Sequence, residues 1–287
     1  MKKITLAHSP DADDIFMYYA IKFGWVDNKD YEIESIGLDI ETLNVEALKG
    51  SYDITAISFG IYPLIRNDYA LLRTAVSFGE GYGPKLIKQK GKKLKQNFKV
   101  ALSGKYTTNA MLFRIYYPNA RYVYMNFLEI EDAVINGEVD AGVLIHESIL
   151  DFDNSLEVEK EIWDIWVELA GEGLPLPLGG MAIRRSIPLN RAIELENILI
   201  DGVKVANERK DELCKKLEED KLVRISDEML IKYLDMYASD ESIELSSLQL
   251  KALDKLYEIG LDSGMWREVI RTKDYLIPRE YKELREL

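Results

Sequence analysis

Short apolar runs alternate with helical patterns through the first third of the chain. Apolar runs at residues 4–7, 31–36 and 53–57 have the length and composition of β-strands. One helix is expected after Asp11, and another at residues 42–49, where a glycine closes it. Strand, helix and strand joined by such short connections predict βαβ units around a parallel sheet.

The alternation breaks at residues 79–97 and then resumes. This segment is rich in glycine and carries the basic run Lys88-Gln89-Lys90-Gly91-Lys92-Lys93, which is typical of a solvated loop. It therefore predicts a crossover or hinge rather than the interior of an element. Beyond it, strands are expected at residues 98–102, 121–124 and 140–145.

Helical patterns accompany these strands and extend to the C-terminus. Helices are predicted at residues 107–117 and 159–169, with one between them that Asn126 and Glu129 open in near capping-box fashion. The run Leu-Pro-Leu-Pro-Leu-Gly-Gly at residues 174–180 predicts a rigid connection that cannot be helical. The C-terminal hundred residues contain long segments of helical periodicity at residues 192–216, 227–237 and 246–259.

Each of the two βαβ blocks is too small to be a complete dinucleotide-binding unit. Joined by two crossovers rich in glycine or proline, they predict an α/β clamshell of two lobes. One lobe is expected to hold residues 1–88 together with the helical residues 186–287, and the other residues 89–185. Folds of this kind bind small molecules in the cleft, near strand C-termini and helix N-termini.

The composition is that of an ordinary soluble globular protein. The chain has 287 residues, of which 47% are hydrophobic and 30% charged, and a formal net charge of −13. That charge disfavours nucleic acid and anionic membrane surfaces as partners and leaves a small-molecule substrate as the expected one. The first apolar run is too short for a secretory signal, and no stretch is long enough to span a bilayer, so a cytoplasmic protein is expected. Exposed apolar positions on the C-terminal helices would allow a homodimer.

Two groups of residues resemble metal ligands but have simpler explanations. Cys214 is the single cysteine, lies in a polar helical stretch, and has no neighbouring histidine with which to form a site. The carboxylates of Asp11, Asp13 and Asp14 open a helix, where acidic residues more often serve capping and the helix dipole than a cation. We therefore expect no metal.

The two histidines, His8 and His146, each follow a predicted buried strand. Histidine is the side chain best matched to proton transfer near neutral pH, although a lone histidine is often structural. His146 ends the run Gly142-Val143-Leu144-Ile145 and is followed by Glu147 and Ser148, at the place where α/β folds put their sites. His146 is therefore the stronger candidate, and a role for His8 stays open.

A turn of small and polar residues, Ser103-Gly104-Lys105-Tyr106-Thr107-Thr108-Asn109, joins a predicted strand to a helix. Free amides at the helix start attract anions, the hydroxyls of Thr107 and Thr108 could add donors, and Lys105 could add a charge. The same residues would equally make an ordinary βα turn with a threonine N-cap. Ser58 occupies the equivalent place in the first lobe.

Several of these motifs together resemble one family of enzymes. The motifs, in chain order, are His8-Ser9-Pro10-Asp11-Ala12-Asp13-Asp14-Ile15-Phe16, Tyr52-Asp53-Ile54-Thr55-Ala56-Ile57-Ser58, Gly81-Tyr82-Gly83-Pro84, Thr107-Thr108-Asn109-Ala110, Gly142-Val143-Leu144-Ile145-His146-Glu147-Ser148 and the Leu-Pro-Leu-Pro-Leu-Gly-Gly run. The ordered set covers about residues 1–185. It resembles the 1,4-dihydroxy-6-naphthoate synthases, lyases of menaquinone biosynthesis.

The resemblance implies a bilobal fold of the periplasmic-binding-protein type 2. It also implies that cyclic dehypoxanthine futalosine is converted to 1,4-dihydroxy-6-naphthoate, without metal or redox cofactor. A neutral His146 would be the proton acceptor, as the general base. The substrate would lie between two sets of residues, Ala56, Ile57 and Ser58 on one side, and Thr108 and Asn109, next to Thr107, on the other.

Two departures from the family pattern lie at expected pocket positions. The opening motif usually carries fewer acidic residues than it does here, and an alanine more usually stands where this chain has Asn109. Two alternative functions share the fold. One is the chorismate dehydratase of the same pathway, and the other is a non-enzymatic protein that binds a small molecule.

Overall fold

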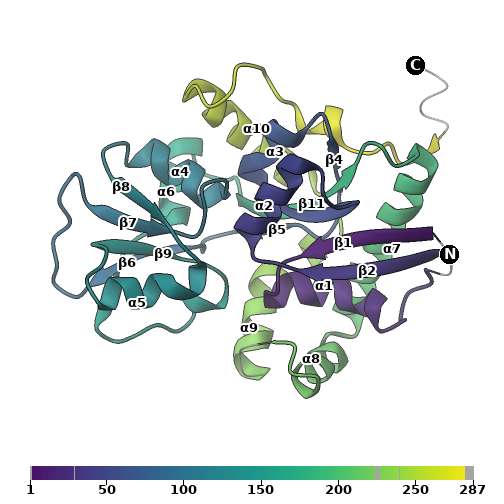
Figure 1. The fold of residues 1–287 in the computed structure, drawn as a ribbon, viewed down its shortest axis with the longest axis horizontal. Helices are drawn as coiled ribbons and strands as arrows, with labels where there is room; N and C mark the ends of the chain where they lie inside the picture. Colours follow the sequence, from purple (N-terminus) through teal and green to yellow (C-terminus); the bar gives the residue numbers. More distant parts are fainter. Residues whose placement is uncertain (1, 29, 224–226, 239, 282–287) are drawn as a thin grey trace.

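The computed structural model describes residues 2–281 apart from residues 29, 224–226 and 239, and it has two lobes that lie side by side (Figure 1). Each lobe is built around one β-sheet with helices on its faces. The expected fold class, an α/β clamshell of two lobes with a helical C-terminal segment, is confirmed. No helix within the described residues has both the length and the apolar character that a membrane span requires.

The first sheet contains strands from both halves of the chain. Its order is β2–β1–β3–β11–β4, and β5 pairs with β11. β1 is parallel to β2 and β3, whereas β11 is antiparallel to each of its partners. The strands are β1 (Lys2–His8), β2 (Tyr31–Gly37), β3 (Ile54–Ser58), β4 (Tyr69–Leu71), β5 (Ser77–Gly79) and β11 (Leu176–Arg184).

The second sheet is formed by one continuous part of the chain, in the order β10–β6–β9–β7–β8. β7 is parallel to β8 and β9, and β6 is antiparallel to β9 and β10. The strands are β6 (Lys85–Gln89), β7 (Lys99–Leu102), β8 (Arg121–Tyr124), β9 (Ala141–Leu144) and β10 (Leu156–Glu161). Both sheets are therefore mixed, and the expected parallel sheet is present only in part.

The helices that face the cleft begin directly after strands. α1 (Ala12–Lys22) follows β1 and α2 (Ile40–Lys49) follows β2, while in the second lobe α4 (Thr108–Tyr116) follows β7. The remaining helices of that lobe are α5 (Ile130–Ile135) and α6 (Ile162–Ala170), and a 3₁₀ turn, η3 (His146–Ile149), follows β9. Short connections of this kind bring strand C-termini and helix N-termini to the same edge of each sheet.

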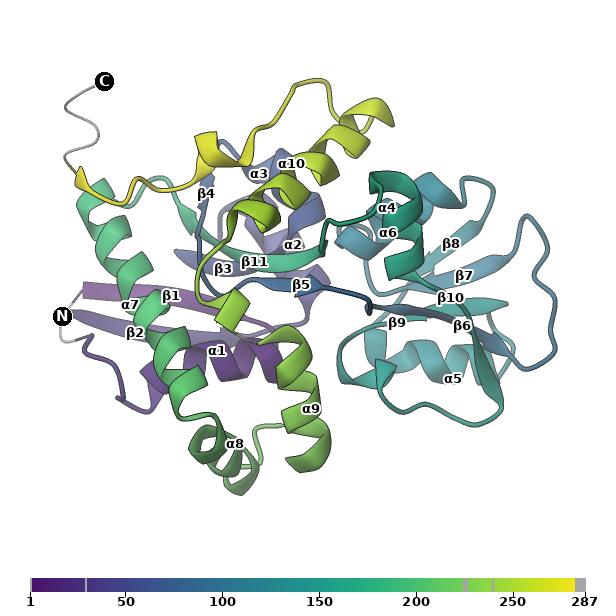
Figure 2. The ribbon, with the colours of Figure 1, turned by 180° about the vertical axis from the view of Figure 1, so that it is seen from behind.

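The C-terminal helices pack on the first lobe, where α7 packs against α1 (Figure 2). They are α7 (Leu189–Glu208), α8 (Lys210–Glu219), α9 (Asp227–Tyr237) and α10 (Ser247–Asp262). α10 begins with a capping box in which Ser246 and Gln249 each satisfy the other's backbone N–H. α9 contacts both α1 and β5, so this late segment reaches the edge of the cleft.

Three strands lie where the sequence predicts something else. β6 falls in the expected hinge, β10 takes the first residues of the helix expected at 159–169, and β11 includes most of the expected rigid connection. Lysine in β6 is tolerated because Lys88 lies 2.5 Å from Glu159 and 3.5 Å from Glu157 on the neighbouring strand. Proline in β11 is tolerated because the register with β5 shifts immediately after Pro177.

These strands also decide where the chain crosses between lobes. β6 pairs within the second sheet and β11 within the first, whereas a division at residues 88 and 185 places each of them in the other lobe. Sheet membership therefore puts the two crossovers at about residues 80–84 and 171–175.

Candidate functional site

A cavity lies between the two lobes and takes side chains from both. Its empty space is about 700 Å³, counting its open mouth. Its lining residues are Ser9, Asp11, Asp13, Asp14, Ile40, Ala56, Ile57, Ser58, Ala75, Ser77, Pro84, Thr107, Thr108, Asn109, Ile145, His146, Leu178, Gly179, Gly180, Tyr233 and Tyr237.

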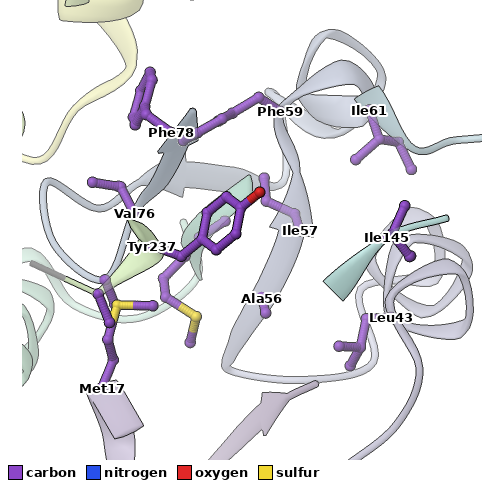
Figure 3. Close-up of a cluster of buried hydrophobic side chains, with 14 of the residues drawn as sticks. Met17, Leu43, Ala56, Ile57, Phe59, Ile61, Val76, Phe78, Ile145 and Tyr237 are labelled. Carbon is purple, nitrogen blue, oxygen red and sulfur yellow. The ribbon is translucent and has the colours of Figure 1, made fainter. Parts of the chain in front are cut away.

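The structure brings all seven residues predicted for the site to this one cavity. The end of β3 supplies Ala56, Ile57 and Ser58, the start of α4 supplies the residues from Thr107 to Asn109, and His146 follows β9. Figure 3 shows Ala56 and Ile57 on one side, Ile145 of the second lobe on the other, and the ring of Tyr237 close to β3. One wall of the cavity is therefore apolar.

His146 is held in an unusual position at the cavity. Its backbone has φ of 55°, in the left-handed region that residues other than glycine seldom adopt. Its ring packs edge-on against Phe127, with the centroids 4.9 Å apart. Its Nε2 lies 2.8 Å from Oδ2 of Asp11, which belongs to the first lobe and is fully buried. Among the described residues Nε2 has no partner with the alignment of a hydrogen bond, so its contact with Asp11 is an ion pair.

The surrounding acids keep this histidine protonated at neutral pH. Burial lowers the pKa of His146, but the charges of Asp11, Asp13 and Glu147 outweigh burial and raise that pKa to about 9. Burial, with Asp11 and Glu147 nearby, raises the pKa of Asp13 to about 6, against the opposing charge of His146. A pKa of about 9 favours the protonated ring at pH 7, so the neutral ring expected for a base is the minor form.

Asp11, Asp13 and Asp14 have separate partners rather than a shared capping role. Asp11 is the N-cap residue of α1 but makes no side-chain cap bond, and it accepts instead from the hydroxyl of Ser9. Oδ2 of Asp14 accepts from the Ser9 amide at 2.7 Å, and Oδ1 of Asp13 accepts from the Tyr233 hydroxyl at 3.3 Å. The predicted capping role of Asp11 is thus wrong.

The cap of α1 comes from the other lobe. Oε1 of Glu147 accepts from the amide of Ala12, the first residue of α1, at 3.0 Å. Within the residues that the structure describes, no group of three or more histidine, cysteine, aspartate or glutamate side chains is arranged to hold a metal ion.

Ser58 is oriented by a residue that the sequence did not reveal. Asn44 is fully buried on α2, its Oδ1 accepts from the Ser58 amide at 2.9 Å, and its Nδ2 donates to the Ser58 hydroxyl at 3.0 Å. Because the Ser58 oxygen already accepts from Asn44, the hydroxyl proton of Ser58 remains to be donated to a ligand.

The start of α4 uses its hydroxyls for structure and leaves its amides free. The Thr107 hydroxyl caps the helix by accepting from the Ala110 amide, and the Thr108 hydroxyl accepts from Gly60 and donates to Leu178, both in the first lobe. The donors that remain for a bound molecule are therefore the amides of Thr108 and Asn109. These amides have no hydrogen-bond partner among the described residues. Lys105 is exposed and does not line the cavity.

Asn109 contributes a second polar group beside these amides. Its Oδ1 is buried and has no hydrogen-bond partner within the described part of the chain. A buried acceptor without a donor is costly, so a donor on a bound molecule would be favourable here.

His8, the other candidate, is structural. Its ring nitrogens contact the Ser9 carbonyl at 2.7 Å and the Ser35 hydroxyl at 2.9 Å, and it does not line the cavity. Burial lowers the pKa of His8, which favours the neutral form of the ring.

Tyr233 and Tyr237 of α9 line the cavity from a segment that the sequence suggested only as helix. Their positions follow from the packing of α9 on α1, which leaves no local signal in the sequence. The sequence does contain a weak signal for Asn44. Its amide lies on the apolar face of a predicted helix, where a buried polar side chain requires hydrogen-bond partners.

The cavity thus presents two chemically distinct sets of polar groups, which we call its proton-transfer end and its anion end. At one end, the acidic residues and His146 can hold and exchange a proton. At the other, the α4 amides and the Ser58 hydroxyl present donors that favour an anion such as a carboxylate, and Oδ1 of Asn109 presents an acceptor for a donor group of the same molecule.

Comparison with known proteins identifies a family to which the chain belongs. The profile of a family described as "Menaquinone biosynthesis" matches residues 4–261. A 1,4-dihydroxy-6-naphthoate synthase of Thermus thermophilus is 28% identical over 90% of this chain and 93% of its own length. An enzyme of the same name from Streptomyces coelicolor is 29% identical over 71% of this chain and 73% of its own length.

Solved structures confirm the fold. A protein of Archaeoglobus fulgidus superposes with a TM-score of 0.84 at 35% identity, over 92% of this chain and 98% of its own. The periplasmic aliphatic sulphonate-binding protein of Escherichia coli superposes with a TM-score of 0.66 at 10% identity, over 96% of this chain and 98% of its own. This second likeness shows a shared periplasmic-binding-protein fold and nothing about the ligand.

Proposed function

The chain belongs to the menaquinone biosynthesis family, and we propose that it is a 1,4-dihydroxy-6-naphthoate synthase of the futalosine pathway. As such it is a lyase that converts cyclic dehypoxanthine futalosine to 1,4-dihydroxy-6-naphthoate and releases the sugar-derived fragment. Two relatives that carry this name and match most of the chain support the proposal. The observation that carries it is the placement of His146 against Asp11 at a cavity that both lobes line.

In this proposal His146 is the general base and Asp11 is its partner. Asp11 faces Nε2, so Nδ1 is the nitrogen that can take a proton from the substrate. The proton moves from a substrate carbon to Nδ1, and the C–H electron pair forms the π bond that completes the aromatic naphthalene. The C–C bond to the sugar-derived part breaks at the same time, and its electron pair leaves with that fragment, which takes up a proton. Because the pKa of His146 is about 9, only a small fraction of the ring is neutral at pH 7, but that fraction is a strong base.

The opposite end of the cavity would hold the substrate carboxylate. The free amides of Thr108 and Asn109 and the Ser58 hydroxyl are the donors suited to an anion there. The apolar wall of Ala56 and Ile57 would lie along the ring system, and closed lobes would keep water from the reactive intermediate.

The proposed step moves a proton and breaks one C–C bond, so it uses no metal and no redox cofactor. We place the enzyme in the cytoplasm, as a proposal that cell fractionation would test.

The experiment is to incubate purified protein with cyclic dehypoxanthine futalosine and to follow naphthoate formation by chromatography with mass detection. Naphthoate from the wild-type protein, and not from the His146→Gln variant, is the expected result. Recovery of the substrate unchanged after binding would contradict the lyase and favour a binding protein. Turnover of chorismate in a parallel assay would favour the dehydratase instead.

A further inference from the structure

Two carboxylates cross the cleft in opposite directions. Glu41 of the first lobe accepts from the amide of Lys105 at 2.8 Å and from the amide of Tyr106 at 3.0 Å, both in the second lobe. Glu147 of the second lobe accepts from the amide of Ala12 in the first. Each lobe therefore holds the backbone of the other through a charged acceptor, the stronger kind of hydrogen bond.

Both carboxylates contact the start of a helix that lines the cavity. Ala12 is the first residue of α1, and Lys105 and Tyr106 lie immediately before Thr107, the N-cap residue of α4. Asp11 precedes Ala12 and pairs with His146, which in turn precedes Glu147. The bond from Glu147 is thus adjacent to the proton-transfer end, and the bonds from Glu41 are adjacent to the anion end.

The local backbone is adapted to both contacts. A Cβ atom on Gly104 would lie 2.3 Å from Oε2 of Glu41 and 2.6 Å from its Cβ, so only glycine lets the turn come this close. On the other side, the left-handed backbone of His146 immediately precedes Glu147. These features occur where the lobes meet and indicate that both contacts are built into the closed structure.

We propose that Glu41 and Glu147 are positioning residues that hold the lobes closed and each serve one end of the cavity. Glu147 fixes the start of α1 and so keeps Asp11 of one lobe against His146 of the other. Glu41 fixes the turn before α4 and so keeps the free amides aimed at the substrate anion. The assignment of the two ends to chemistry and to binding rests on the proposed function, whereas lobe closure does not.

The kinetic test compares alanine and glutamine variants at both positions. Glu147→Ala is expected to lower kcat by about 10- to 100-fold with KM changed less than about threefold, because it disturbs the reacting end. Glu41→Ala is expected to raise KM by about tenfold with kcat changed less than about threefold, because it disturbs the binding end. Glutamine keeps an acceptor oxygen, so each glutamine variant should recover part of the loss.

Glu131→Gln is the matched control. Glu131 also accepts a backbone N–H, that of Asp153 at 2.7 Å, but within the second lobe. Its kinetic constants should stay at the wild-type values. If an alanine variant does not fold, the glutamine variant carries the test, with an expected change of about fivefold in the same constant and the other constant unchanged. If the Glu41 and Glu147 variants change kcat and KM to the same extent, the division between the two ends is overturned.

Closure is measured separately by small-angle X-ray scattering of the ligand-free full chain. Both alanine variants should have a larger radius of gyration than the wild-type protein and Glu131→Gln. Unchanged scattering and unchanged kinetic constants in both variants would overturn the proposal. A larger radius of gyration in variants of a protein that never forms naphthoate would instead sink the lyase and leave the closing role intact.

Discussion

The ends of β1 and β9 each carry a histidine, and the two histidines differ in almost every physical respect. His8 uses both ring nitrogens in short-range contacts and packs against Tyr18 and Tyr19, with ring centroids 5.4 and 5.9 Å away. His146 has acidic residues around it, a left-handed backbone and a place on the cavity. His8 is the last residue of its strand and His146 lies just beyond its own, so the strand end alone does not make a site.

What separates them is the position of carboxylates across the cleft. Burial dominates at His8 and lowers its pKa. At His146 the charges of the opposite lobe's aspartates and of the adjacent Glu147 outweigh burial and raise the pKa. The raised pKa of His146 therefore depends on the contact between the two lobes. The following experiments test that contrast.

Replacement of His146 by glutamine should have the largest effect. Loss of the base is expected to lower kcat by about 10³-fold while the fold is retained, because general base catalysis is worth about 10²–10⁴. Steady-state kinetics with a circular dichroism control would measure this. Activity within tenfold of wild type would remove His146 from the proposed role.

Replacement of Asp11 by asparagine should act through His146. In the wild-type protein kcat/KM should rise with pH and level off near the His146 pKa of about 9. The variant loses the charge nearest to the ring. The charges of Asp13 on α1 and Glu147 on η3 still act on the ring, and Tyr233 of α9 still donates to Asp13. The pH of levelling should fall by at least about one unit. Above pH 9, where the ring is neutral in both proteins, kcat should fall by about 10-fold because the weaker base has also lost its partner. An unchanged pH profile would show that Asp11 is not the partner.

Replacement of Asn44 by alanine should change substrate binding more than chemistry. The variant leaves the Ser58 amide unpaired and its hydroxyl unoriented, at a cost of about 1–2 kcal/mol in stability. KM should rise about tenfold with little change in kcat, measured by initial rates. A loss confined to kcat would contradict this placement of Ser58.

The stability of the protein should depend on pH through His146. A folded-state pKa of about 9 above the usual 6.5 gives stability that is fully present below pH 6.5 and is lost as pH rises through about 9. Urea unfolding should show a loss of about 1–3 kcal/mol between these pH values. The loss should be smaller in His146→Gln, and an equal loss in both proteins would show that other groups cause it.

Replacement of His8 by glutamine should have the smallest effect on turnover. Activity should stay within about threefold of wild type, because neither ring nitrogen faces the cavity, while stability falls by about 1–2 kcal/mol. Thermal unfolding and initial rates together would measure this. A loss of kcat comparable with that of His146→Gln would erase the contrast between the two histidines.

The fold was predictable where local patterns and tertiary structure agree. β1, β9 and the helix after Asp11 have clear periodicity and lie where expected. β6 and β11 were not predictable, because lysines paired with glutamates on the next strand and a proline at a register shift resemble loop sequence locally. Their stability comes from partners distant in the chain.

The site was predictable only where its residues lie at recognisable places in the local pattern. His146 and Ser58 follow strands and could be found from that position, and the resemblance to the family added the others. The pairing of Asp11 with His146 and the contact of Tyr233 with Asp13 join residues far apart in sequence. Nothing in the local pattern around Asp11 distinguishes a helix cap from an ion pair across a cleft.

The insertion of β11 between β3 and β4 has a consequence for the chain as it leaves the ribosome. The second sheet is formed by consecutive residues and can assemble as soon as they emerge, whereas β3 lacks its β11 neighbour until the whole second lobe has been made. At about 5–20 residues per second, this free edge of an apolar strand persists for on the order of ten seconds. The nascent protein should therefore fold its second lobe first and complete the N-terminal lobe last.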